Sequence, residues 1–234
     1  MNAIAASAFT LWNSSIGKKT VVAATGLFFI VFLMAHLGGN LLLFVGQDAF
    51  NAYAHKLHHL GEGSVIWIAR FVLLAAITLH VVATIQLTKA NRAARTAYAH
   101  EGTLRATKSS KIMIWSGLTV LAFIIYHILH FTTRTSSATL AKIVNTPDPN
   151  GYKNAYGMVI EGFRNIPTSI FYVIAITLLC SHLSHGFASA FQTLGLRSKK
   201  TSDLLNNLGK VYSVGIWLGF VSIPISILIF GYGK

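Results

Sequence analysis

The sequence predicts an all-α membrane protein in which five transmembrane helices form one bundle, with residues 1–234 as a single domain. Hydrophobic residues make up 53% of the chain and charged residues only 11%. Five apolar runs each reach the roughly 20 residues that a helix needs to cross a hydrocarbon core of about 30 Å. We expect the helices near residues 20–45, 65–88, 112–131, 167–191 and 208–230.

Each run has its own supporting signal. The first follows Lys18 and Lys19 and is too long for the apolar part of a signal peptide, which favours an uncleaved span. Trp67 and Trp115 fall near ends of the second and third runs, where amphipathic rings prefer the headgroup level. Tyr172, Tyr212 and Tyr232 likewise fall near ends of the fourth and fifth runs. The fifth lacks histidine, contains Pro224, and is expected to complete the packing.

Basic residues predict the orientation, because short connections rich in lysine and arginine stay in the cytoplasm. The amino-terminal tail, the second connection and the fourth connection hold most of them: Lys18, Lys19, Lys89, Arg92, Arg95, Arg105, Lys108, Lys111, Arg197, Lys199, Lys200 and Lys210. The amino terminus is therefore expected inside, in a bacterial cytoplasmic membrane, and we call this side the inner side. We therefore attribute the net charge of +13 to the orientation of the chain in the membrane and to attraction for anionic lipid or an acidic partner. No nucleic-acid partner is expected.

Four of the apolar runs carry a histidine deep inside them: His36, His80, His127 and His182. An imidazole in hydrocarbon is costly without a partner. With about 1.5 Å of rise per residue, His36 and His127 lie roughly 25 and 24 Å above the inner ends of their helices. His80 and His182 each lie roughly 22 Å below the outer ends, hence roughly 8 Å above the inner boundary of the core. The histidines thus form two level pairs about 15 Å apart.

Paired histidines at matched depths predict two bound haem b groups, with His36 and His127 as one pair of axial iron ligands and His80 and His182 as the other. His130 and His185 are rivals, because each lies one turn beyond a preferred ligand and shares its face. The alternative for any single histidine is a bond to a backbone carbonyl or a place in a polar cavity. The level pairing favours haem over that alternative.

The cysteine and the acidic residues count against several kinds of redox and transport site. Cys180 is the only cysteine, which excludes a disulfide, a cluster held by four thiolates, and haem attached through Cys-x-x-Cys-His. All six acids lie in connections or at their edges. Proton pumps and cation transporters generally need a carboxylate within the membrane, so a haem-free histidine-lined transporter is the weaker alternative.

The two outer connections hold further candidates. In residues 132–166, the sequence TPDPNG at 146–151 is a strong turn signal, and apolar residues then recur at helical spacing, which predicts an amphipathic lid. His55, His58 and His59 in the first outer connection could serve a quinone by proton exchange or belong to a solvated loop, and the sequence leaves both open. For haem propionates, Lys19, Lys89 and Lys108 are inner candidates and Arg70 an outer one, although lipid headgroups are the more common partners of such residues.

At these residues the chain resembles the five-helix, di-haem cytochrome b subunit of succinate dehydrogenase and menaquinol-fumarate reductase. The matching stretches are VFLMAHL at 31–37 with Asn40, DAFNAYAH at 48–55, TLHV at 78–81, IYHI at 125–128, and HLSHGFAS at 182–189 followed by TLG at 193–195. Each pattern is weak alone. Their order, spacing and helix placement together carry the resemblance over nearly the whole chain.

The resemblance implies a membrane anchor that performs no succinate chemistry itself. A flavoprotein subunit and an iron-sulfur subunit would bind on the cytoplasmic side, and electrons would reach a membrane quinone, menaquinone being the expected one. It also assigns His36 with His127 to the distal haem and His80 with His182 to the proximal one. Some fumarate reductases of this family carry a glutamate at the position of Cys180, so the proton path proposed there is expected to be absent. A cytochrome b of a formate dehydrogenase or hydrogenase is the nearest alternative.

Overall fold

The structure is a computed structural model that describes residues 12–93 and 108–233, with side chains from residue 113 onward in the second range. Within these ranges the chain forms helices and no β-strand. Five helices are long and apolar enough to cross a membrane: Ser15–Phe44, Ser64–Ala93, Met113–Thr132, Ile166–Thr193 and Ser202–Leu228. The predicted all-α membrane bundle with five spanning helices is confirmed, and the protein is a multi-pass membrane protein.

Most observed helices extend beyond the predicted ones at one or both ends, although the first and the fifth spans end slightly earlier than predicted. Helix α2 (Ser15–Leu41) begins with Ser14, whose side chain accepts a hydrogen bond from the backbone N–H of Gly17 at 2.9 Å. Helix α8 (Ile166–Thr193) begins in the same way, with Asn165 accepting from the N–H of Thr168 at 3.0 Å. Helices α4 (Ser64–Ala93) and α9 (Ser202–Leu228) also include polar end turns. Hydropathy detects only the apolar centre of a helix, whereas capping extends it into the headgroup region.

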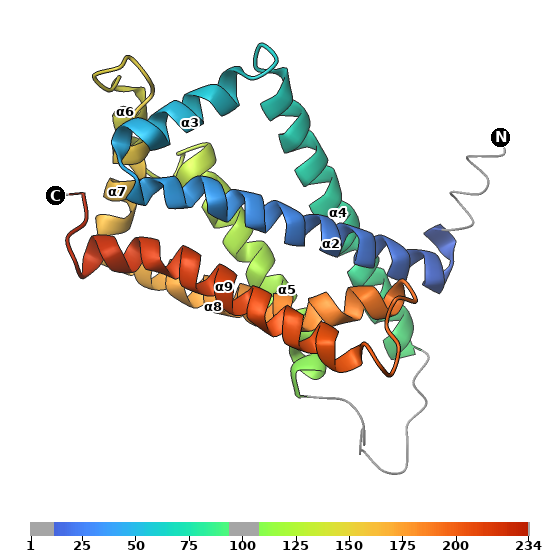
Figure 1. Cartoon of the computed structure of the whole chain (residues 1–234). Helices are drawn as coiled ribbons and strands as arrows, with labels where there is room; N and C mark the ends of the chain where they lie inside the picture. Colours follow the sequence, from blue (N-terminus) through green and yellow to red (C-terminus); the bar gives the residue numbers. More distant parts are fainter. Residues whose placement is uncertain (1–11, 94–107, 234) are drawn as a thin grey trace.

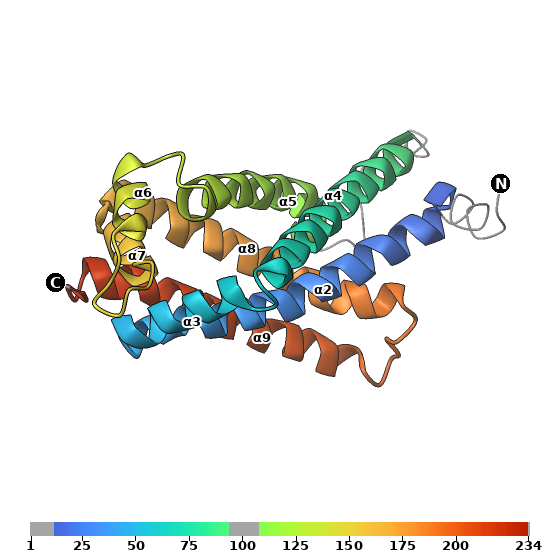
Figure 2. The same cartoon turned by 90° about the horizontal axis from the view of Figure 1, so that it is seen from above.

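Helices α2 and α8 form the centre of the bundle. Helix α9 packs along α8 and also against α2, α4 packs mainly on α2, and α5 (Lys108–His127) packs mainly on α8. In Figure 1, α2, α8 and α9 run along the length of the molecule, with α6 and α7 at one end. Figures 1 and 2 show α4 inclined to α2, and α3 running from the end that holds α6 and α7 to the start of α4. The four helices that carry the predicted ligands are therefore α2, α4, α5 and α8.

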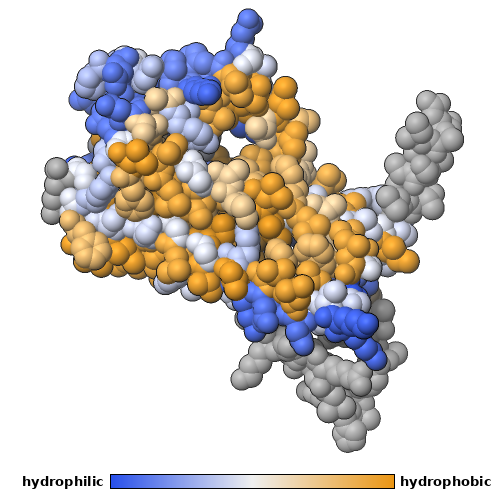
Figure 3. Space-filling view, in the orientation of Figure 1, coloured by the Kyte–Doolittle hydropathy of each residue, from blue (hydrophilic) through white to orange (hydrophobic). Residues whose placement is uncertain are grey.

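The surface matches a chain that lies in lipid. Hydrophobic residues cover the middle of the molecule in Figure 3, and hydrophilic residues gather toward its two ends. Large apolar side chains such as Phe71 on α4 and Val211 on α9 are 73% and 70% exposed. So much exposed apolar surface is unfavourable in water and is suited to contact with lipid.

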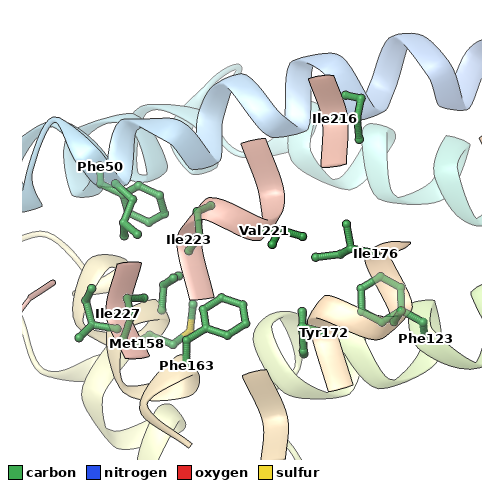
Figure 4. Packing of buried hydrophobic residues seen from close by; sticks show 14 of the residues in the cluster. Phe50, Phe123, Met158, Phe163, Tyr172, Ile176, Ile216, Val221, Ile223 and Ile227 are labelled. Atoms are coloured by element: carbon green, nitrogen blue, oxygen red, sulfur yellow. The ribbon is translucent and has the colours of Figure 1, made fainter. Parts of the chain in front are cut away.

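The outer end is closed by three shorter helices: α3 (Gln47–His59), α6 (Ala138–Asn145) and α7 (Ala155–Arg164). The first outer connection is therefore largely helical. The turn signal at 146–151 is followed by α7, an amphipathic helix that buries Met158 and Phe163 among others. Figure 4 shows these two side chains packed with Ile227 of α9, while Phe123, Tyr172 and Ile176 lie together farther along the bundle.

A buried asparagine joins α3 to the turn before α7. Asn51 is fully buried, donates to the Asp148 carboxylate at 2.9 Å, and accepts from the backbone N–H of Tyr156 at 2.8 Å. The same carboxylate accepts from the backbone N–H groups of Asn150 and Tyr152. We call this set, Asn51 with Asp148 and the three N–H groups, the outer clasp. It links segments about a hundred residues apart and fixes the lid over the bundle.

Replacing Asn51 with alanine should loosen the outer clasp. The Tyr156 N–H and the Asp148 carboxylate would each lose a partner, and an unsatisfied buried N–H costs about 1–3 kcal/mol. We expect the opening free energy of α3 and α7, measured by hydrogen exchange, to fall by about that amount. Asn150→Ala is the matched control, because it removes only an exposed side-chain bond to Asp48. Equal exchange in the two variants would contradict the clasp.

Candidate functional site

His36 and His127 face each other from α2 and α5. Their ring centroids lie 5.9 Å apart with an angle of 84° between the ring planes. Bonds of about 2 Å from imidazole nitrogen to a metal ion would place two such rings roughly 6 Å apart. The spacing therefore fits two ligands of one iron. Aromatic side chains surround the pair, with Phe32 stacked on His36 at 5.3 Å and Phe123 at 5.9 Å from His127.

His80 and His182 form the inner pair, on α4 and α8. The two rings lie close enough for a charge on His80 to act on His182. Each ring also lies against bare backbone of a neighbouring helix. A Cβ atom on Gly26 of α2 would meet His80 Cε1 at 3.8 Å, and one on Gly117 of α5 would meet His182 Cε1 at 3.5 Å. Glycine at these positions keeps the helix surface flat beside the imidazoles, which suits a planar ligand.

Three of the four imidazoles have an oxygen beside Nδ1. Thr25 Oγ1 lies 2.9 Å from His80 Nδ1, and Ser116 Oγ lies 3.1 Å from His182 Nδ1. At the outer pair, Tyr172 Oη lies 3.3 Å from His127 Nδ1. Nδ1 of His36 instead has the Asn40 amide nitrogen at 3.4 Å. Ring nitrogen Nε2 is the atom that remains to bind a metal.

The rival histidines are placed differently. His130 lies in the π-helical turn Ile128–Thr132, whose extra residue rotates the chain, and is only 4% exposed. Its Nδ1 lies 3.1 Å from Tyr172 Oη, and its ring stacks on Tyr126 at 5.3 Å. His185 follows His182 on α8 by three residues and is half-buried. The structure thus brings His127 to His36 and turns His130 toward Tyr172, while the choice of ligand remains a prediction in both cases.

The cations proposed for propionates lie at the ends of the spans. Lys19 and Lys89 are exposed. The Arg70 guanidinium lies 4.8 Å from the centroid of the Trp67 ring, a cation–π contact that suits the membrane interface. The side chain of Lys108 lies outside the described residues, as do Arg95 and Arg105 of the second connection. None of the described cations contacts the histidine pairs in a way that assigns it to a propionate.

Histidines of α3 lie beside the outer clasp. The His55 ring stacks on His59 at 4.0 Å and on Tyr152 at 4.3 Å. Burial lowers the pKa of His58, and the positive charges of Arg70, Lys153, His59 and Arg134 lower it further. Sequence reasoning left these histidines between a quinone site and a solvated loop. The structure places them on a helix that packs on the lid, in cationic surroundings.

The pKa of Asp148, like that of His58, is lowered. Burial alone would raise its pKa, but hydrogen bonds from Asn51 and from the backbone of Tyr152 and Asn150, with the nearby His55, together lower it. The sequence alone indicates Asp148 only as part of a turn. The residue that completes the clasp, Asn51, lies 97 positions earlier, so no local pattern indicates the contact.

Comparison with known proteins identifies no family for this chain: no family model, no curated protein and no solved structure matches it. The functional argument therefore depends on the residues and their geometry.

Acidification should weaken the outer cap of α3, α6 and α7. The folded-state pKa values of His58 and Asp148 are both lowered, so the folded cap binds fewer protons than the opened cap. The resulting stability is present at neutral pH, begins to fall below the ordinary histidine pKa of about 6.5, and falls further below that of a carboxylate, about 4. Hydrogen-exchange protection factors of α3, corrected for intrinsic rates, should decrease from pH 7 to pH 4, while those of α9 stay constant. His58→Gln should remove the decrease between pH 7 and pH 5; protection that rises on acidification would contradict the sign.

Proposed function

We propose that this chain is the membrane-anchor cytochrome b subunit of a succinate:quinone oxidoreductase in a bacterial cytoplasmic membrane. It would hold two haem b groups and connect a flavoprotein and an iron-sulfur subunit on the inner side with a membrane quinone, menaquinone being the expected species. The observation that carries the proposal is the ring contact of 5.9 Å between His36 and His127, since two imidazoles from different helices meet at a metal-binding distance inside an apolar bundle.

A second pair of histidines also suits haem. His80 and His182 supply two further imidazoles toward the inner end, beside the glycine backbone of two other helices. Two imidazoles with a planar cofactor between them are a suitable donor set for haem iron, whereas a bare ion needs more ligands from the protein.

The residues indicate what kind of haem protein this would be. When bound, haem supplies reversible one-electron transfer. The histidine pairs would occupy both axial positions, so they leave no iron position open to oxygen. Cys180 is buried to 6% exposure within α8 and has no second cysteine for a disulfide. The chain would therefore act as an electron-transfer subunit without a catalytic residue for succinate.

The inner surface suits an acidic partner. Among the side chains that the structure describes, the one ion pair joins Arg164 to Glu161, at the outer end. On the inner side, the Arg197 guanidinium donates to the neutral side chains of Gln192, Ser202 and Asn206. Lys199 and Lys200 beside it are exposed. Such uncompensated positive charge favours docking of a protein with an acidic surface.

Haem content tests the proposal directly. The full-length chain, purified from membranes of haem-supplied cells, should bind two b-type haems, as measured by a dithionite-reduced minus oxidised spectrum and a pyridine haemochrome assay. His36→Ala and His80→Ala should each reduce the content from two haems to one. His127→Ala and His182→Ala should do the same. His185→Ala, one turn from His182, is the matched control and should retain two.

The other outcomes are equally decisive. A colourless wild-type protein would refute the proposal. Loss of a haem in His130→Ala, with two retained in His127→Ala, would refute the outer ligand assignment. If haem is present, succinate-dependent quinone reduction by the chain with its co-purifying subunits tests the succinate assignment, and formate or hydrogen as the only working donor would replace it.

A further inference from the structure

The oxygens beside the histidine Nδ1 atoms come from helices other than those of the histidines. Thr25 on α2 reaches His80 on α4, and Ser116 on α5 reaches His182 on α8. Tyr172 on α8 reaches His127 on α5. Each oxygen therefore fixes a ring relative to a neighbouring helix. A neutral imidazole carries its proton on one nitrogen only, so the direction of each hydrogen bond decides which nitrogen can bind a metal.

The direction follows from the second bond of each hydroxyl at the inner pair. Thr25 donates its hydroxyl hydrogen to the Val21 carbonyl at 2.7 Å, and Ser116 donates to the Met113 carbonyl at 2.9 Å. A hydroxyl has a single hydrogen and can also accept. With that hydrogen engaged, both oxygens accept from the imidazole. His80 and His182 therefore carry the proton on Nδ1 and present the lone pair of Nε2.

Tyr172 repeats this arrangement at the outer pair, with His130 in place of a carbonyl. Its hydroxyl lies 3.1 Å from His130 Nδ1 and 3.3 Å from His127 Nδ1, and both His130 and Tyr172 are buried. The one phenolic hydrogen can serve only one of these nitrogens. Donation to the nearer His130 leaves the oxygen to accept from His127 Nδ1–H. This arrangement assigns a role to His130 that does not involve iron.

We propose that Thr25, Ser116 and Tyr172 are positioning residues that hold His80, His182 and His127 in the Nδ1–H tautomer, with Nε2 directed to a haem iron. This inference depends on the proposed function. Metal-binding histidines usually donate their other N–H to an acceptor, which fixes the ring and makes it a stronger ligand. Here hydroxyl oxygens, themselves fixed by a second hydrogen bond, act as those acceptors.

His36 is the exception, and it provides a control. The Asn40 amide nitrogen near its Nδ1 is a donor that already binds the His36 carbonyl at 2.8 Å. The His36 ring instead stacks nearly parallel to Phe32, with 12° between the planes. The Asn40 amide nitrogen has two hydrogens and no acceptor lone pair, so it can donate to His36 Nδ1 but cannot hold a proton there. His36 therefore lacks the acceptor that the other three histidines have. The outer pair thus has one hydrogen-bonded ligand and one held by stacking.

A merely structural explanation is available and can be tested. Serine and threonine in membrane helices often donate to a carbonyl one turn back simply to satisfy the hydroxyl. Thr84 does so at the backbone carbonyl of His80 itself, at 2.7 Å, and has no bond to the ring. Thr84→Val therefore removes a comparable hydroxyl beside the same histidine. It is the matched control for Thr25→Val.

The experiment compares haem retention and midpoint potential in the purified full-length chain. Thr25→Val, Ser116→Ala and Tyr172→Phe each remove one acceptor, and each should weaken haem retention at one site about 10–100-fold. The midpoint potential of that haem should rise, because an imidazole without its Nδ1–H acceptor donates less charge to ferric iron. Thr25→Ser should restore both properties. Thr25→Val and Ser116→Ala should affect the inner haem only, and Tyr172→Phe the outer haem only.

The outcomes separate this inference from the proposed function. A wild-type chain without haem would refute the proposed function. Two haems in the wild type, with Thr25→Val and Ser116→Ala identical to Thr84→Val and Asn40→Leu in retention and potential, would overturn the positioning role and leave the proposed function intact. If Thr25→Val fails to assemble, Ser116→Ala gives the same test at the other ligand of the inner pair.

Discussion

The structure depends on how polar groups are satisfied inside an apolar bundle. Hydrocarbon offers no water, so each hydroxyl and imidazole within the spans must find a partner in the protein. Among the described residues, no buried side-chain nitrogen or oxygen lacks one. The hydroxyls do this locally, with Thr78, Thr84 and Thr88 on α4 each donating to a carbonyl one turn back. His80, His127 and His182 instead take polar partners on neighbouring helices.

This difference explains the contacts between helices. His80 has to reach α2, His182 has to reach α5, and His127 has to reach α8. These polar contacts connect α4 to α2 and α5 to α8, two pairs of helices that also pack directly on each other. Helix α9 carries no histidine and packs on both central helices, with the Tyr212 hydroxyl donating to the Ile30 carbonyl at 2.6 Å. The same helices that bury apolar surface therefore also place the imidazoles.

The two ends of the bundle are built differently. The outer end is enclosed by aromatic rings around Tyr172, including Phe123 at 5.2 Å and Phe163 at 5.0 Å, and is covered by the lid that the outer clasp holds. The inner end is bounded by short basic connections. His36 and His127 therefore lie among packed aromatic side chains, whereas His80 and His182 lie toward the end that holds the exposed Lys89, Lys199 and Lys200.

Local patterns were sufficient for the spans and for the levels of the histidines. Hydropathy depends on consecutive residues, and the rise per residue of a helix converts sequence distance into depth, so His36 and His127 could be placed at one level before their ring contact was seen. The turn at 146–151 and the amphipathic α7 were also local signals. Helix α3 was not predicted, because it lacks a long hydrophobic run, although Phe50, Tyr53 and Leu57 recur at helical spacing.

The sequence by itself determined the class of the protein, its five spans and the set of histidines, since each depends on residues close together in the chain. Tertiary structure alone decided the partners. Thr25 meets His80 across 55 positions, and Asn51 meets Asp148 across 97, contacts that no periodicity encodes. The π-helical turn Ile128–Thr132 likewise brings His130 to Tyr172, which lies on a different helix. The physical reason is that depth in a membrane follows from helix geometry, whereas the direction of a side chain depends on which helix is its neighbour.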